Sequence, residues 1–183
     1  MKHRLAFAIF NVVGFQSVWF ACVAGAGLGL VWPGLLACAL FAIIVLAWGG
    51  KRRDDLRALA CLLPLGILID SAFAASGWLA YAQPWPWVHA APVWIAALWV
   101  GFILTLNHSL SFLRDRPWLA LIFGLLGGPA AYAASANVFG AVEFGVEPTL
   151  ALAAVALCWA LVTPLAFVLI RKTAPLSATA NAS

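Results

Sequence analysis

Six long runs of apolar residues, separated by short polar or charged connections, cover most of this chain of 183 residues. Each run approaches the roughly 20 residues that an α-helix needs to cross a bilayer, so each predicts a transmembrane helix. Short connections make consecutive helices antiparallel neighbours. We therefore expect an all-α, polytopic membrane bundle, whose six transmembrane helices span Leu5–Val23, Val31–Trp48, Leu56–Trp78, Pro92–Phe112, Pro117–Ala136 and Thr149–Ile170.

The composition supports this prediction and argues against a soluble protein. Hydrophobic residues make up 66% of the chain and charged residues 9%, whereas soluble domains are about 25% charged. We expect one membrane domain over residues 1–172 and a disordered tail, rich in Ala, Ser and Thr, over residues 173–183. The first apolar run follows basic residues, as in a cleaved leader, but it exceeds the usual ~7–15 residues. We therefore expect it to be retained.

The basic residues decide how the predicted spans are oriented. The net charge is +4, and the ten Lys and Arg residues fall in four groups, at residues 2–4, 51–57, 114–116 and 171–172. Counting spans puts all four groups on one side, and the three opposite connections hold no Lys or Arg, which is the positive-inside pattern. We expect a multi-pass membrane protein with both termini in the cytoplasm. The expected partner is the lipid bilayer, not nucleic acid.

Asp70 is the one charged residue that lies away from the ends of the apolar runs. A charge in hydrocarbon is costly, so such a residue is a candidate for function. Gly66 and Ala74 lie one helical turn away on either side, and small residues allow close helix packing, so we expect Asp70 on a packed face. One interpretation is a proton carrier, substrate ligand or general acid/base. The other is a structural carboxyl that bonds across helices to Gln16 or Tyr132.

Helical rise separates the polar residues of the predicted spans into two layers. At about 1.5 Å per residue, Gln16, Asp70 and Tyr132 lie about 18–24 Å from the basic boundary, where we expect them to line a polar cavity. Asn11 and Asn107 lie about 10 Å from the same boundary. These two amides are expected to bind a ligand on the cytoplasmic side of that cavity.

His108 is the second candidate for acid/base chemistry. It lies about 10 Å closer to the basic boundary than Asp70, which is well beyond hydrogen-bond reach, so a direct pair is not expected. The three histidines are dispersed, and neither H-E-x-x-H nor a P-loop motif occurs. We therefore expect no metal and no cofactor. The four cysteines lack metal-site spacing and are expected to pack as small apolar residues.

Several short motifs follow one another in a characteristic order. They are Asn11 with Phe15-Gln16 and Trp19-Phe20, Asp70-Ser71, Pro92-Val93-Trp94, Leu98-Trp99, Thr105-Leu106-Asn107, and Gly127-Gly128-Pro129 with Tyr132. In this order they resemble a bacterial inner-membrane family catalogued as domain of unknown function 2878. The resemblance covers roughly residues 11–170. It implies a location in the bacterial inner (cytoplasmic) membrane but no established activity. Genes of that family often lie near enzymes that modify fatty-acyl chains, such as cyclopropane-fatty-acid-synthase-like methyltransferases, so the resemblance favours a connection with lipid.

Three hypotheses for function remain open at this point. A small transporter or lipid-handling protein would bind a small molecule or lipid in a polar cavity around Asp70. A membrane-embedded enzyme, or an accessory subunit of one, would act on acyl chains with Asp70 or His108 as the acid/base. A structural assembly partner would use its small-residue faces to form a homo-oligomer or to bind another membrane protein. We favour the first hypothesis over an enzyme.

Overall fold

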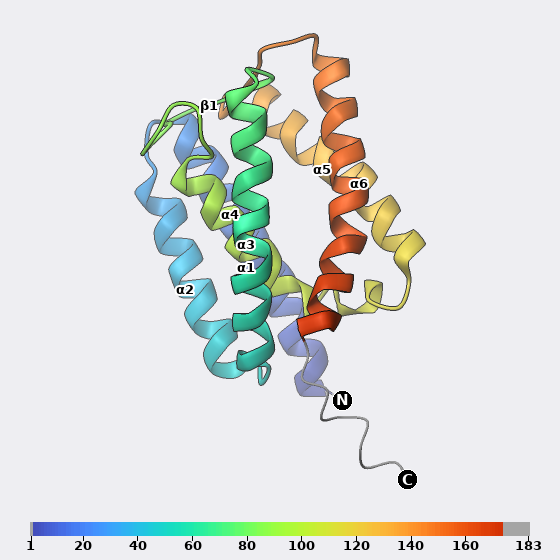
Figure 1. Ribbon diagram of the computed structural model, residues 1–183. Helices are drawn as coiled ribbons and strands as arrows, with labels where there is room; N and C mark the ends of the chain where they lie inside the picture. Colours follow the sequence, from blue (N-terminus) through green and yellow to red (C-terminus); the bar gives the residue numbers. More distant parts are fainter. Residues whose placement is uncertain (1, 174–183) are drawn as a thin grey trace.

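The computed structural model describes residues 2–173, which form a bundle of six α-helices (Figure 1). The predicted all-α fold is confirmed, and residues 174–183 of the predicted tail lie outside the described part. A 3-10 turn, η1 (Ser111–Leu113), precedes α5, and two short strands, β1 (Leu79–Tyr81) and β2 (Val142–Phe144), follow α3 and α5. The helices are α1 (Lys2–Gly27), α2 (Trp32–Trp48), α3 (Arg52–Ala75), α4 (Val93–Leu106), α5 (Pro117–Asn137) and α6 (Pro148–Thr173).

The helices fall into a larger group and a hairpin. Helix α1 packs against α2 and α4, α3 packs against α4 and α6, and α5 packs chiefly against α6 (Figure 1). Strands β1 and β2 pair antiparallel, with Ala80 opposite Glu143, at the end of the bundle opposite the start of α1 and the end of α6. The α5–α6 hairpin is therefore joined to the other helices mainly through α3 and the strand pair.

Four helices are long and apolar enough to cross a membrane by length and composition: Leu5–Gly27, Arg52–Ala75, Pro117–Asn137 and Pro148–Lys172. Helices α2 and α4 are shorter, with 17 and 14 residues. Helix α4 differs most from expectation, because the predicted span over residues 92–112 ends at Leu106. The carbonyl oxygen of Thr105 accepts hydrogen bonds from the backbone N–H groups of His108 and Leu110, each at 3.0 Å, so the chain turns there.

Small residues on α3 allow a bulky aromatic side chain to approach. A Cβ on Gly66 would lie 2.1 Å from the Trp99 ring, so only glycine leaves room for that ring. Gly66, Asp70 and Ala74 are all buried on one face of α3, as their spacing predicts. Gly77, which falls within the predicted third span, lies beyond the end of α3 with φ at +73°, a conformation that glycine adopts without steric cost.

Replacing Gly124 with alanine should force α5 and α6 apart. A Cβ at this position would lie 2.1 Å from the backbone carbonyl oxygen of Trp159 in α6, and a backbone atom cannot rotate away. We expect the free energy of unfolding to fall by about 1–3 kcal/mol, the usual cost of overpacking. Gly127→Ala is the matched control, because nothing lies within 4 Å of its new Cβ. Thermal unfolding in detergent compares the two variants, and equal unfolding temperatures would contradict the close contact.

Candidate functional site

Asp70 lies at the centre of a buried hydrogen-bond cluster that four elements build. Its Oδ1 accepts hydrogen bonds from the hydroxyl of Tyr81 at 2.7 Å and from the hydroxyl of Tyr132. Its Oδ2 accepts one from the indole N–H of Trp99 at 2.6 Å. Asp70 takes part in none of the ion pairs found among residues 2–173. The two oxygens of a carboxyl group offer enough lone pairs to accept from all three donors.

Aromatic packing fixes the position of the Trp99 donor. The Trp99 ring stacks on Trp159 of α6, with ring centroids 5.0 Å apart and planes 9° apart. The missing side chain at Gly66 leaves room on α3 for the same ring. Because α4 supplies Trp99 and α6 supplies Trp159, this stack holds the Asp70 cluster between the larger helix group and the α5–α6 hairpin.

Strand β1 positions the Tyr81 donor. The Tyr81 ring packs edge-on against Trp94, with centroids 5.9 Å apart, and the Trp94 indole donates a hydrogen bond to the Ala82 carbonyl oxygen at 2.8 Å. Burial raises the pKa of Tyr81 well above its usual range, and the neighbouring Tyr132 and Asp70 raise it further. The Tyr81 hydroxyl therefore keeps the proton that it donates to Asp70.

An apolar groove of about 550 Å³ runs beside this cluster. Residues of α1, α4 and α5 line most of it, together with Asp70 and with Trp159 of α6. Val12 on α1 and Phe123 and Gly127 on α5 line the groove, yet they are exposed on the surface of the molecule. The groove therefore opens sideways between α1 and α5. Its walls include the aromatic residues Phe15, Trp19, Trp94, Phe102, Phe123 and Trp159.

Gln16 lies in the opening of this groove instead of bonding to Asp70. The sequence grouped it with Asp70 by depth, and the structure places both residues on the groove wall. The side chain of Gln16 is exposed, and it makes no hydrogen bond within the described part of the chain. A primary amide offers both donors and an acceptor. Gln16 can therefore hydrogen-bond a molecule in the groove, whereas the Asp70 oxygens are already engaged.

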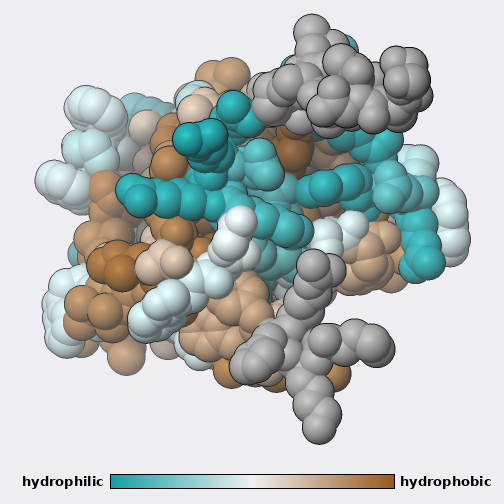
Figure 2. All heavy atoms as spheres, turned by 90° about the horizontal axis from the view of Figure 1, so that it is seen from below, coloured by the Kyte–Doolittle hydropathy of each residue, from teal (hydrophilic) through white to brown (hydrophobic). Residues whose placement is uncertain are grey.

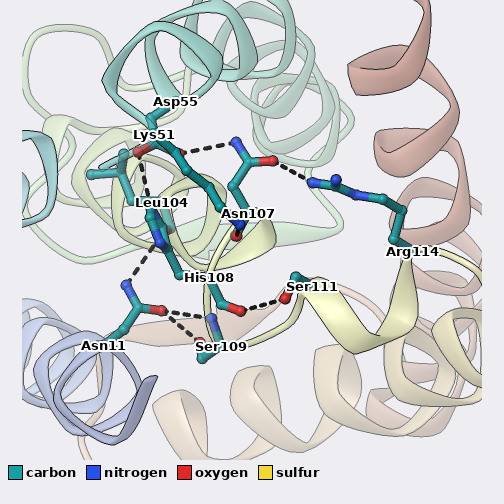
Figure 3. Close-up of polar contacts among 9 residues, drawn as sticks. All are labelled: Asn11, Lys51, Asp55, Leu104, Asn107, His108, Ser109, Ser111 and Arg114. Carbon is teal, nitrogen blue, oxygen red and sulfur yellow. Dashed lines mark hydrogen bonds and ion pairs between the residues drawn. The ribbon is translucent and has the colours of Figure 1, made fainter. Parts of the chain in front are cut away.

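A second buried cluster lies at the opposite end of the bundle from the strands (Figure 3). Asp55 of α3 is fully buried and accepts a hydrogen bond from Nδ2 of Asn107 at 2.9 Å. Its other oxygen lies 2.9 Å from Nε2 of His108. Lys51 donates to the Asn107 carbonyl oxygen at 2.5 Å, and Arg114 donates to the Asn107 side-chain oxygen at 2.7 Å. Asp55 thus fixes the turn after α4 to the start of α3.

Asn11 ties α1 to the same turn (Figure 3). Its Nδ2 donates to the Leu104 carbonyl oxygen at 3.2 Å, and its Oδ1 accepts from the Ser109 hydroxyl at 2.6 Å. Both Asn11 and Asn107 were expected to face a cavity, but neither is among the residues that line the groove. Their amides are instead used to hold three helices together at this end of the bundle.

The two candidate acid/base residues belong to different clusters. His108 bonds to Asp55, whereas Asp70 bonds to two tyrosines and a tryptophan, in agreement with the depth argument against a direct pair. His108 does not line the groove. Within residues 2–173, no group of three or more His, Cys, Asp or Glu side chains is placed to hold a metal ion.

Sequence reasoning missed three residues of these clusters. Asp55 follows Asp54 at the start of α3, where acidic residues commonly face solvent and favour the helix dipole. Tyr81 lies in a connection outside the apolar runs, and Trp99 looked like an ordinary apolar packing residue. A buried carboxyl requires hydrogen-bond donors, and each buried tyrosine hydroxyl or indole N–H requires an acceptor. This requirement could have indicated that Tyr81 and Trp99 donate to Asp70.

Comparison with known proteins gives a family but no activity. A family model described as a protein of unknown function (DUF2878) matches residues 8–165. No curated protein and no solved structure matches the chain.

Proposed function

We propose that this chain, which belongs to that family of unknown function, is an integral membrane protein that holds the acyl part of a lipid in the groove between α1 and α5. One observation carries this proposal: a groove of about 550 Å³, with mainly apolar walls, opens on an exposed side of the bundle. In a membrane, such an opening faces hydrocarbon. Acyl chains are then the molecules with direct access to it.

The orientation proposed for the bundle places all six helices across the bacterial inner membrane, with both termini in the cytoplasm. The start of α1 and the end of α6 lie at one end of the bundle. Hydrophilic side chains gather on the face seen there, bordered by apolar surface (Figure 2). Basic residues on one side of the membrane are typical of the cytoplasmic side. With this orientation, the groove opens within the membrane.

Gln16 gives the groove a polar contact for its ligand. Its unpaired amide lies in the opening, about 18 Å from the basic boundary by helical rise. An amide that finds no partner in hydrocarbon is costly, and an ester or carboxyl oxygen of a lipid would accept its N–H. An enzyme is the weaker candidate, because Asp55 and His108 do not line the groove and three donors already occupy Asp70.

Filling the groove should reduce the amount of lipid that the protein retains. Gly127→Phe adds a ring to the groove wall, where nothing lies within 4 Å of a new Cβ. We expect the phospholipid retained per chain after detergent washing to fall by about fivefold, equivalent to ~1 kcal/mol of binding. Quantitative mass spectrometry of extracted lipid measures this ratio.

Leu126→Phe is the matched control for the groove-filling variant. It adds a ring to the neighbouring position of α5, whose side chain is 63% exposed and does not line the groove. Its lipid content should equal that of the wild type. If Gly127→Phe is folded and retains as much lipid as Leu126→Phe, the groove is not the lipid site.

A further inference from the structure

A second pocket, separate from the groove, lies at the end of the bundle where α5 begins and α6 ends. Its volume is about 270 Å³, and its wall includes Arg114 and Asp115 before α5, Pro117 in the first turn of α5, and Phe167 and Arg171 on α6. None of these residues lines the groove. A ligand in this pocket would therefore occupy a different site from the proposed acyl chain.

The charged groups of this pocket favour an anion. Arg114 uses one terminal nitrogen to bond Asn107, but its buried Nε has no hydrogen-bond partner within the described residues. Arg171 donates to the Arg114 carbonyl oxygen and, at 3.1 Å, to Asp115. Arg171 is 53% exposed, and Asp115 is 87% exposed. A buried donor without an acceptor is costly. An anionic oxygen in the pocket would supply the acceptor that the Nε of Arg114 lacks.

The start of α5 adds a second source of positive potential. Pro117 and Ala120 line the pocket from the first turn of α5, which contains no acidic residue and has no side-chain cap. The N-terminus of a helix carries a partial positive charge and favours phosphate or carboxylate groups. Two arginines and this helix end thus line the pocket with one acidic residue, Asp115, so positive groups outnumber negative ones there.

We propose that this pocket binds a phosphate group through Arg114 and Arg171. A lipid headgroup and a soluble phosphate are the two sources of such a group. The floor of the pocket favours the lipid, because Leu113, Ala120 and Phe167 are buried apolar residues. An anionic phospholipid combines the phosphate for the arginines with glycerol and acyl carbons for that floor. The inference uses the membrane orientation proposed above, but not the occupant of the groove.

Titration with phosphatidylglycerol, followed by native mass spectrometry of the purified protein in detergent, tests this site. Arg171→Gln should weaken phosphatidylglycerol binding by about fivefold or more. Lys172→Gln is the matched control, because it removes an adjacent exposed charge that does not line the pocket, and its effect should stay within about twofold. Equal effects of the two variants would overturn the proposal, since they would indicate only general attraction to a basic surface.

Two further experiments complete this test. One fills the pocket without removing a charge, and the other distinguishes a lipid headgroup from soluble phosphate. Val168→Trp fills the pocket from a half-exposed position without removing a charge, and it should weaken binding as Arg171→Gln does. Unchanged binding by a folded Val168→Trp variant would overturn the pocket as the site. Inorganic phosphate at millimolar concentration should fail to displace phosphatidylglycerol; displacement would assign the site to soluble phosphate. The comparison of Arg171→Gln with Lys172→Gln is repeated in the Gly127→Phe background, where the groove is filled. The difference between the two variants should persist there, which separates a failure of this site from a failure of the groove proposal.

Discussion

Replacing Asp70 with alanine is expected to lower the free energy of unfolding by about 3–6 kcal/mol. The substitution removes the common acceptor of three buried donors, the hydroxyls of Tyr81 and Tyr132 and the indole N–H of Trp99. Each donor left without a partner costs about 1–3 kcal/mol. The change should exceed that of any single donor removal, because one substitution strands all three donors. Unfolding in mixed micelles of detergent and denaturant measures it.

Two conservative variants separate the contributions of the individual hydrogen bonds to this loss of stability. Asp70→Asn keeps one acceptor oxygen and strands about one donor, so it should cost about 1–3 kcal/mol. Tyr81→Phe removes a donor and leaves the carboxylate with two, so it should cost about 1 kcal/mol. The expected order of stability is therefore wild type, Tyr81→Phe, Asp70→Asn and Asp70→Ala. If Asp70→Ala were as stable as Tyr81→Phe, Asp70 would not be the centre of the cluster.

Replacing Asp55 with alanine is expected to cost about 2–6 kcal/mol of unfolding free energy, because it leaves two buried side chains without an acceptor, at about 1–3 kcal/mol each. Asp55 is fully buried between Asn107 and His108. Its loss would leave both of these side chains without an acceptor, beside the cationic Lys51 and Arg114. The turn that ends α4 should loosen with it, so hydrogen exchange at residues 105–111 should rise.

Asp54→Ala is the control for this prediction. Asp54 is the preceding residue and carries the same charge, but its side chain is 55% exposed and pairs with Arg57 at 3.6 Å. Exposed pairs contribute about 0–1 kcal/mol, so this variant should remain close to the wild type in stability. If Asp54→Ala and Asp55→Ala lowered the free energy of unfolding equally, a negative charge at the start of α3 would explain the result, and the burial of Asp55 would not.

The helices were predictable because their signal is local. Apolar runs of the right length locate five of the six helices to within a few residues of their observed ends. Helix α4 is the exception, because apolar residues continue past Leu106 while the turn is made by bonds to Thr105 and by partners on α1 and α3. Hydropathy contains no information about such distant partners.

The site was predictable only in part, because its contacts join distant segments. Asp70 and Tyr132 could be grouped by depth, since both lie in regular helices that start from a basic boundary. Tyr81 reaches Asp70 from a strand whose position depends on pairing with β2, so depth counting could not place it. The groove likewise exists because α5 packs against α6 and not against α1. The spacing of residues along a single helix does not specify which neighbour that helix packs against.

Photocrosslinking with a phospholipid that carries a diazirine on its acyl chain tests the lipid-binding groove most directly. Peptide mapping by mass spectrometry should find the label concentrated on groove residues of α1 and α5, such as Phe15 and Phe123. Filling the groove through Gly127→Phe should remove that excess, while labelling of the outward-facing Leu36 and Leu40 on α2 stays constant. Labelling that is even over all exposed apolar residues and unchanged in Gly127→Phe would contradict the account.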